Sequence, residues 1–180
     1  MENASEDRRA AAVAAMEANR FAEVYRLWLP LAEIGDAEAQ GHVGSLMQCG
    51  LHRFESLEQL DAAAGSATDA ATAAADREQA GWYLQAASAA GIGPASFNLA
   101  TLYVGGYGGG TWEERKAKAA ELYARAYAQG FTAFGWLMHG SGPGQPYLDA
   151  MEKFLIEGDQ SPPPEWWRAE PGTCSNPTGG

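Results

Sequence analysis

The sequence has little cysteine, little basic charge and no long apolar run. Its two cysteines, Cys49 and Cys174, fall in a predicted helix and near the end, which argues against a disulfide framework and suits a reducing compartment. The 12 basic residues against 23 acidic ones give a formal charge of −11, which disfavours nucleic acids and anionic membranes as partners. The acidic start lacks the basic residues of a secretory signal, and no run could span a bilayer, so we expect a soluble cytoplasmic protein.

Groups suited to catalysis or metal binding are also scarce. The weak pair Cys49-x-x-His52 lacks the second pair of ligands that a structural zinc needs. His42 and Ser45 lie three residues apart on one predicted helix, without a third group to orient the histidine. The glycine run at 105–110 lacks the lysine of a phosphate-binding loop, so we expect a flexible inter-repeat loop there. We therefore predict no enzyme, no metal site and no cofactor.

The sequence does contain an internal repeat of small residues, aromatic residues and helix-ending glycines. The segment that starts at Gly35 matches the segment that starts at Gly91, and a partial third copy starts at Gly130. The first period is longer than the second, which indicates an insertion at about 51–75. This pattern is typical of stacked helix pairs. It predicts an all-α fold, a right-handed α-solenoid of antiparallel helix pairs with about two and a half repeats plus capping helices.

The chain is expected to form one domain with four parts. Residues 1–19 form an N-terminal helix, 20–140 the repeat array, 141–158 a C-terminal capping helix, and 159–180 a tail rich in proline and glycine. Arrays need capping helices because a terminal repeat otherwise leaves an apolar face in water.

Several residues carry the signals of helix starts. Asp36 is placed to cap one helix, Asp76 to cap the helix that buries Trp82, and Thr111 to open another in a capping box. Residues 62–75 are mostly alanine and have little to bury, so we expect a mobile loop, with a marginal alanine helix as the alternative.

The segments 32–40 and 91–99 resemble the Sel1-like repeat. Residues 118–126 match that family's Lys-Ala-x-x-Trp-Tyr-x-Lys-Ala pattern, with Leu122 for Trp and Arg125 for Lys. The resemblance covers most of the array and implies a tetratricopeptide-like fold. It also implies scaffolding or adaptor roles, which in some bacteria include neutralisation of toxins. The chain lacks the paired cysteines of the family's branch that is reported to bind or hydrolyse β-lactams.

Candidate binding residues follow from the array, because the first helix of each pair lines the concave face. With Leu99 and Tyr103 in the core, the positions that face the groove in three repeats are Phe97, Thr101, Val104, Ser45, Gln48 and Trp136. Two of these, Phe97 and Trp136, are aromatic residues at one repeat position and candidate anchors. The alternative is that the insertion or the tail covers them.

Trp166 and Trp167, after a run of three prolines, either dock on the array or anchor a partner. The sequence as a whole predicts a non-enzymatic scaffold or adaptor that binds a protein or peptide in its groove, and its acidity favours a basic partner. A bacterial immunity protein or regulatory adaptor is one such role. The alternative is an enzyme, such as a hydrolase, or a small-molecule binder that uses the same groove. The oligomeric state is not predicted.

Overall fold

The computed structural model describes residues 2–63 and 69–131. These residues form helices without any strand, which confirms the all-α class. The elements are α1 (Glu2–Glu17), α2 (Phe21–Glu33), α3 (Ala37–Gln48), the 3-10 turn η1 (Leu51–Arg53), α4 (Leu57–Ala62), α5 (Ala70–Ala89), α6 (Gly93–Val104) and α7 (Trp112–Ala128). The expected capping helix and tail, together with Trp136, Trp166 and Trp167, lie outside the described residues.

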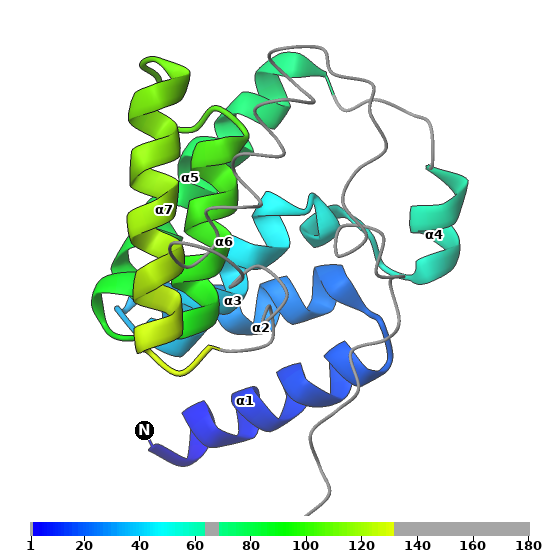
Figure 1. The fold of residues 1–180 in the computed structure, drawn as a ribbon. Helices are drawn as coiled ribbons and strands as arrows, with labels where there is room; N and C mark the ends of the chain where they lie inside the picture. The colour runs from blue at the N-terminus through cyan, green and yellow to red at the C-terminus, as the bar shows by residue number, and fades with distance from the viewer. Residues whose placement is uncertain (1, 64–68, 132–180) are drawn as a thin grey trace, which may run out of the picture.

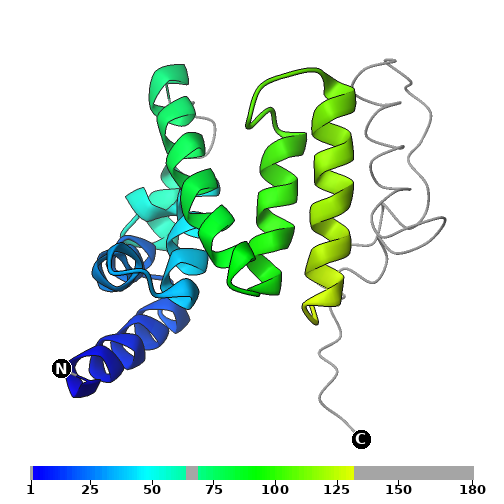
Figure 2. The same ribbon diagram turned by 90° about the vertical axis from the view of Figure 1, so that its left-hand side faces the viewer.

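Each helix packs mainly against helices close to it in the chain. The main contacts join α1 to α2, α2 to α3, α3 to α5, α5 to α6 and α6 to α7. Figure 2 shows α5, α6 and α7 in a row, with α1 and α2 at the end away from α7. Helix α4 lies to one side of the others (Figure 1), and its Leu60 packs against the core. One continuous apolar core connects α1 to α7.

Three helices end with the same geometry, at the glycines that define the sequence repeat. Gly35, Gly91 and Gly130 have φ angles of 92°, 96° and 85°. The residue after each glycine donates its amide to a carbonyl five residues back, at 3.0 or 3.1 Å. Glycine adopts this left-handed conformation without the steric cost of a Cβ, so the helices end where the sequence predicts.

The repeat alignment, in which Gly35, Gly91 and Gly130 are equivalent, also matches buried positions on α2, α5 and α7. At three equivalent positions, all nine side chains are buried. They are Val24, Ala80 and Ala119; Trp28, Leu84 and Tyr123; and Leu31, Ala87 and Ala126. Spacings of four and three residues place these positions on one stripe of each helix.

A buried polar network joins α5, α6 and the end of α7. The hydroxyls of Ser88 and Ser96 lie 2.7 Å apart, and Ser96 donates to Gln129 Oε1 at 2.6 Å. Gln129 Nε2 donates to the Ser88 carbonyl at 2.9 Å. In the first unit, the helix pair α2 and α3, Gln40 Nε2 donates to the carbonyl of Ala32 at 3.2 Å. Ala32 is the repeat equivalent of Ser88. Equivalent carbonyls therefore accept a glutamine amide in both units.

The insertion differs from its expected form at the start of α5. The helix begins at Ala70, and Asp69 caps it by accepting the Thr72 amide at 2.9 Å. Asp76, the predicted cap, instead lies inside the helix and pairs with Arg53. Alanine has the strongest helix propensity, so once a cap is available the alanine run extends the helix. The predicted caps Asp36 and Thr111 are confirmed.

Trp82 was expected in the core, and this prediction is wrong because 59% of its surface is exposed. Ala80 and Leu84 belong to the buried stripe of α5. Trp82 is two residues from each, which places it about 160° around the helix from both. The repeat alignment matches Trp82 with Arg26 and Glu121, two exposed charged residues. The repeat therefore already indicated a water-facing position.

The glycine loop at 105–110 is attached to α5 through Tyr107, which is buried. The Tyr107 ring covers Gly81, and its hydroxyl accepts a hydrogen bond from Gln85 Nε2 at 2.9 Å. The ring also packs edge to face on Tyr103, with centroids 5.2 Å apart. The loop that was expected to be flexible is thus held at its centre.

Candidate binding face

Of the residues predicted to bind a partner, those that the structure describes lie on α3 and α6, which contact each other. Asn98 of α6 donates its Nδ2–H to the Ser45 hydroxyl of α3 at 2.7 Å. Ser45 in turn donates to the Gly41 carbonyl at 2.7 Å. The half-buried Ser45 side chain thus joins the two helices. Sequence reasoning missed Asn98, because its repeat equivalent in α3 is His42 and nothing marks the position as a contact.

The predicted residues of α6 also contact α7. The Phe97 ring centroid lies 5.2 Å from that of Tyr123 and 5.3 Å from that of Phe131. The Thr101 hydroxyl donates to the Phe97 carbonyl at 3.2 Å and lies 3.3 Å from the Tyr123 hydroxyl. Phe97, Thr101 and Val104 are all half-buried. Part of the Phe97 ring therefore packs between α6 and α7, and only the remainder is accessible to a partner.

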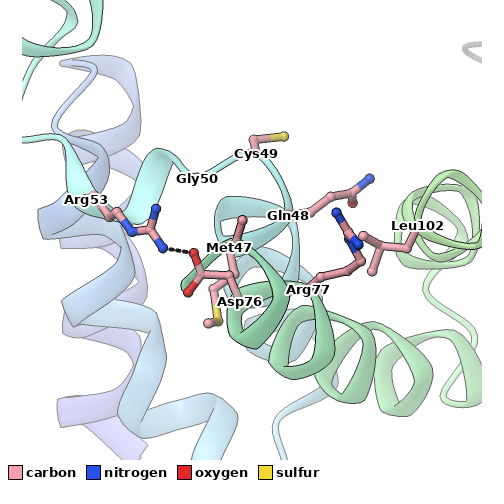
Figure 3. A pocket seen from close by; sticks show the side chains of 9 residues that line it. Met47, Gln48, Cys49, Gly50, Arg53, Asp76, Arg77 and Leu102 are labelled. Atoms are coloured by element: carbon pink, nitrogen blue, oxygen red, sulfur yellow. Dashed lines mark hydrogen bonds and ion pairs between the residues drawn. The ribbon is translucent and has the colours of Figure 1, made fainter. Parts of the chain in front are cut away.

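A hollow of about 240 Å³ opens at the C-terminal end of α3. Its lining residues come from α3, the turn that follows it, α5 and α6: Met47, Gln48, Cys49, Gly50, Arg53, Ala73, Asp76, Arg77 and Leu102. Figure 3 shows Arg53 facing Asp76, with which it forms an ion pair, and the Cys49 thiol pointing away from both. Gln48, one of the predicted residues, has its Oε1 buried without a hydrogen-bond partner in the described part of the chain.

The chemistry of Cys49 and His52 does not favour a reactive or metal-binding pair. Loss of hydration raises the pKa of the Cys49 thiol, which keeps it protonated, whereas nucleophiles and metal ligands are thiolates. His52 lies 3.6 Å from Asp76. Burial lowers the pKa of His52, against the opposing effect of Asp76. Among the described residues, no group of three or more histidine, cysteine or acidic side chains could hold a metal ion.

His42 is held in a stack on Trp28. Its ring lies on Trp28 with centroids 4.7 Å apart and planes at 18°, and the Arg9 guanidinium lies 5.8 Å from the Trp28 ring centroid. Burial lowers the pKa of His42, although the carboxylate of Glu38 acts to raise it. The Ser45 hydroxyl hydrogen points to the Gly41 carbonyl. This arrangement gives the serine no base.

Stability should decrease as the pH falls below about 6.5, the ordinary histidine pKa. In the unfolded chain His42 and His52 take up protons near that pH, whereas their lowered pKa keeps them neutral in the folded chain. Protonation therefore favours unfolding. The free energy of unfolding in urea should decrease between about pH 7.5 and pH 5.5, and a His42→Gln/His52→Gln variant should show a flatter profile. Equal slopes for both proteins would contradict this assignment.

Comparisons with known proteins identify no relative. No protein-family model matches the chain, and neither a curated protein nor a solved structure matches it significantly. The resemblance to the Sel1-like repeat stays a prediction. Across the described residues, no helix combines the length and apolar character that a membrane crossing requires.

Proposed function

We propose that the protein is a non-enzymatic scaffold of the Sel1-like type. In this proposal its helix pairs form a right-handed α-solenoid, and the face made by α3 and α6 binds a protein or peptide. The observation that carries the proposal is the equivalence of the repeated units, in which three helix ends share one geometry and nine side chains share three buried positions. Helix-pair arrays use such equivalent helices to build extended binding surfaces.

Gln48 supports the location of the binding face. A buried carbonyl oxygen without a donor costs about 1–3 kcal/mol, and the described residues leave Gln48 Oε1 in this state. Rotation of the Gln48 side chain into the hollow that it lines would let this oxygen accept a backbone N–H of a bound peptide. The hollow beside Gln48, about 240 Å³, suits one inserted side chain. It is smaller than the sites of about 300–1,000 Å³ that usually hold small-molecule ligands, so at this hollow we favour a peptide side chain as the occupant.

The acidic charge of the chain predicts that the partner is basic. A formal charge of −11 favours association with a basic protein through electrostatic steering. A cytoplasmic adaptor, including a bacterial immunity or regulatory protein, fits this description. The charge and the repeat architecture together make this the function that we propose.

Photo-crosslinking can test the proposed face. A benzophenone amino acid at position 48, the C-terminal end of α3, should crosslink the partner in cell extract, whereas the same group at the exposed Ala117 of α7 should not. Crosslinking from Ala117 alone, or from neither position, would refute the proposal.

A Gln48→Leu variant separates binding from folding. The substitution removes a buried oxygen that has no donor among residues 2–63 and 69–131, so the free energy of unfolding should stay equal or increase. Affinity for the crosslinked partner should fall by about tenfold, since the peptide N–H then loses its acceptor. Unchanged affinity would show that Gln48 does not contact the partner.

A further inference from the structure

Trp82 occupies a repeat position that is exposed in all three units. Its equivalents are charged: Arg26 of α2 pairs with Glu55, and Glu121 of α7 pairs with Lys118 and Arg125. Trp82 leaves 59% of its surface in water at the same position. The charged side chains at this position face water, whereas the Trp82 ring leaves apolar surface there that a partner could cover.

The indole of Trp82 is held in place by a buried neighbour. Its ring lies 4.8 Å from that of Tyr83, edge to face at 71°, and Tyr83 is only 4% exposed. Burial raises the pKa of Tyr83, and the nearby carboxylate of Glu33 adds to this effect, whereas a hydrogen bond with Gln79 acts against it. The contact places the indole beside a fixed ring, which lowers the entropy lost when a partner binds.

Two exposed carboxylates belong to the surroundings of this ring, Glu78 by its place on α5 and Glu33 through its charge on Tyr83, which contacts Trp82. Glu78 precedes Trp82 by four residues on α5, a spacing that places both side chains on one face. Glu33 is the last residue of α2, and its charge acts on Tyr83. Neither carboxylate forms an ion pair within the described residues. The last turn of α2 also contains no basic residue, and a negative charge at a helix C-terminus is unfavourable, so an added cation would relieve Glu33.

We propose that Trp82, Glu33 and Glu78 form a docking surface for a lysine or arginine side chain of a basic protein segment. The cation would lie over the indole face, where the ring attracts positive charge, with the two carboxylates beside it. This surface is separate from the α3–α6 face. This docking proposal rests on the proposed function only in that the partner is a protein. It adds that the contacting segment of the partner is basic.

Charge complementarity selects this occupant over two others. Residues 132–180 of the same chain contain six acidic and two basic residues, so they share the sign of the surface. A second copy of the chain has the same formal charge of −11 and would repel the first. A basic segment of another protein is attracted by both carboxylates and by the indole.

The test is a titration of the full-length protein with an acetylated peptide of alternating glycine and arginine, followed through the indole N–H signals in NMR spectra. The Trp82 signal, assigned with a Trp82→Phe variant, should shift on addition of this peptide and not of a matched glycine–glutamate peptide. Trp82→Ala should weaken binding about fivefold or more. Trp82→Leu should weaken it equally, because leucine keeps apolar bulk without an aromatic face. A Glu33→Gln/Glu78→Gln variant should bind less tightly and depend less on salt.

Control variants make each outcome decisive. Tyr127→Ala removes another exposed aromatic ring and should leave peptide binding within about twofold. Equal binding by Trp82→Leu and the natural protein, or no shift of the Trp82 signal, would overturn the proposal. So would a dimer that dissociates in Trp82→Ala, since the occupant would then be a second copy. Crosslinking from position 48 tests the α3–α6 face independently, so a failure there with an intact titration would refute the proposed function alone.

Discussion

Gly81→Ala is expected to destabilise the protein by about 2–3 kcal/mol, although alanine is the better helix former by about 1 kcal/mol. A Cβ at position 81 would lie 2.2 Å from Cζ and 2.3 Å from Cε2 of Tyr107. The ring would have to leave its buried site and release its hydrogen bond with Gln85. The free energy of unfolding, measured in urea with the helical circular-dichroism signal, would report the loss.

A double-mutant cycle with Tyr107→Ala tests the steric explanation. Without the ring, the three atoms that the new methyl group would meet most closely are gone, so Gly81→Ala should become neutral or stabilise the helix by up to about 1 kcal/mol. The change of sign between the two backgrounds is the expected result. An equal destabilisation in both backgrounds would contradict the role of Tyr107.

Trp28→Ala is expected to cost about 3–5 kcal/mol, the range for removal of a buried tryptophan. Trp28 is only 2% exposed. Its ring contacts His42 of α3 and lies near the Arg9 guanidinium of α1, so its loss would leave a cavity where three helices meet. Urea unfolding would measure the cost, and limited proteolysis would show whether α1 detaches. Arg9 also pairs with Asp36 and Glu38, which should retain part of the α1 contact.

Trp82→Ala is the matched control for Trp28→Ala, because the chemical change is identical. Trp82 is mostly exposed and belongs to no buried stripe, so its removal should change the free energy of unfolding by no more than about 0.5 kcal/mol. Similar losses for the two variants would contradict the burial pattern of α2 and α5.

Helix ends were predictable from the sequence because their causes are local. The left-handed turn at Gly35 and the cap at Asp36 depend on atoms within a few residues of each other. The start of α5 was not predictable in the same way. Both Asp69 and Asp76 can cap a helix, and the choice depends on whether the alanine run between them becomes helical.

The candidate binding face was only partly predictable. Repeat spacing placed Ser45 and Thr101 at equivalent positions, yet Ser45 contacts Asn98 while Thr101 lies beside Tyr123. These contacts depend on how closely and at what angle neighbouring helices cross, which a periodic pattern does not specify. The Gln48 oxygen, which has no donor in the part of the chain that the structure describes, and the hollow beside it likewise arise where α3, α5 and α6 meet.

The sequence by itself determined the helical class, the repeat and the ends of the helices other than the start of α5, because propensity, capping and the steric freedom of glycine act over a few residues. The alignment of the three copies even placed Trp82 at a position that is charged in the other two. Only the tertiary structure decided which residues distant in the chain meet: Tyr107 on Gly81, and Asn98 on Ser45. These contacts join residues distant in the chain, or depend on what surrounds them, so packing of whole helices determines them.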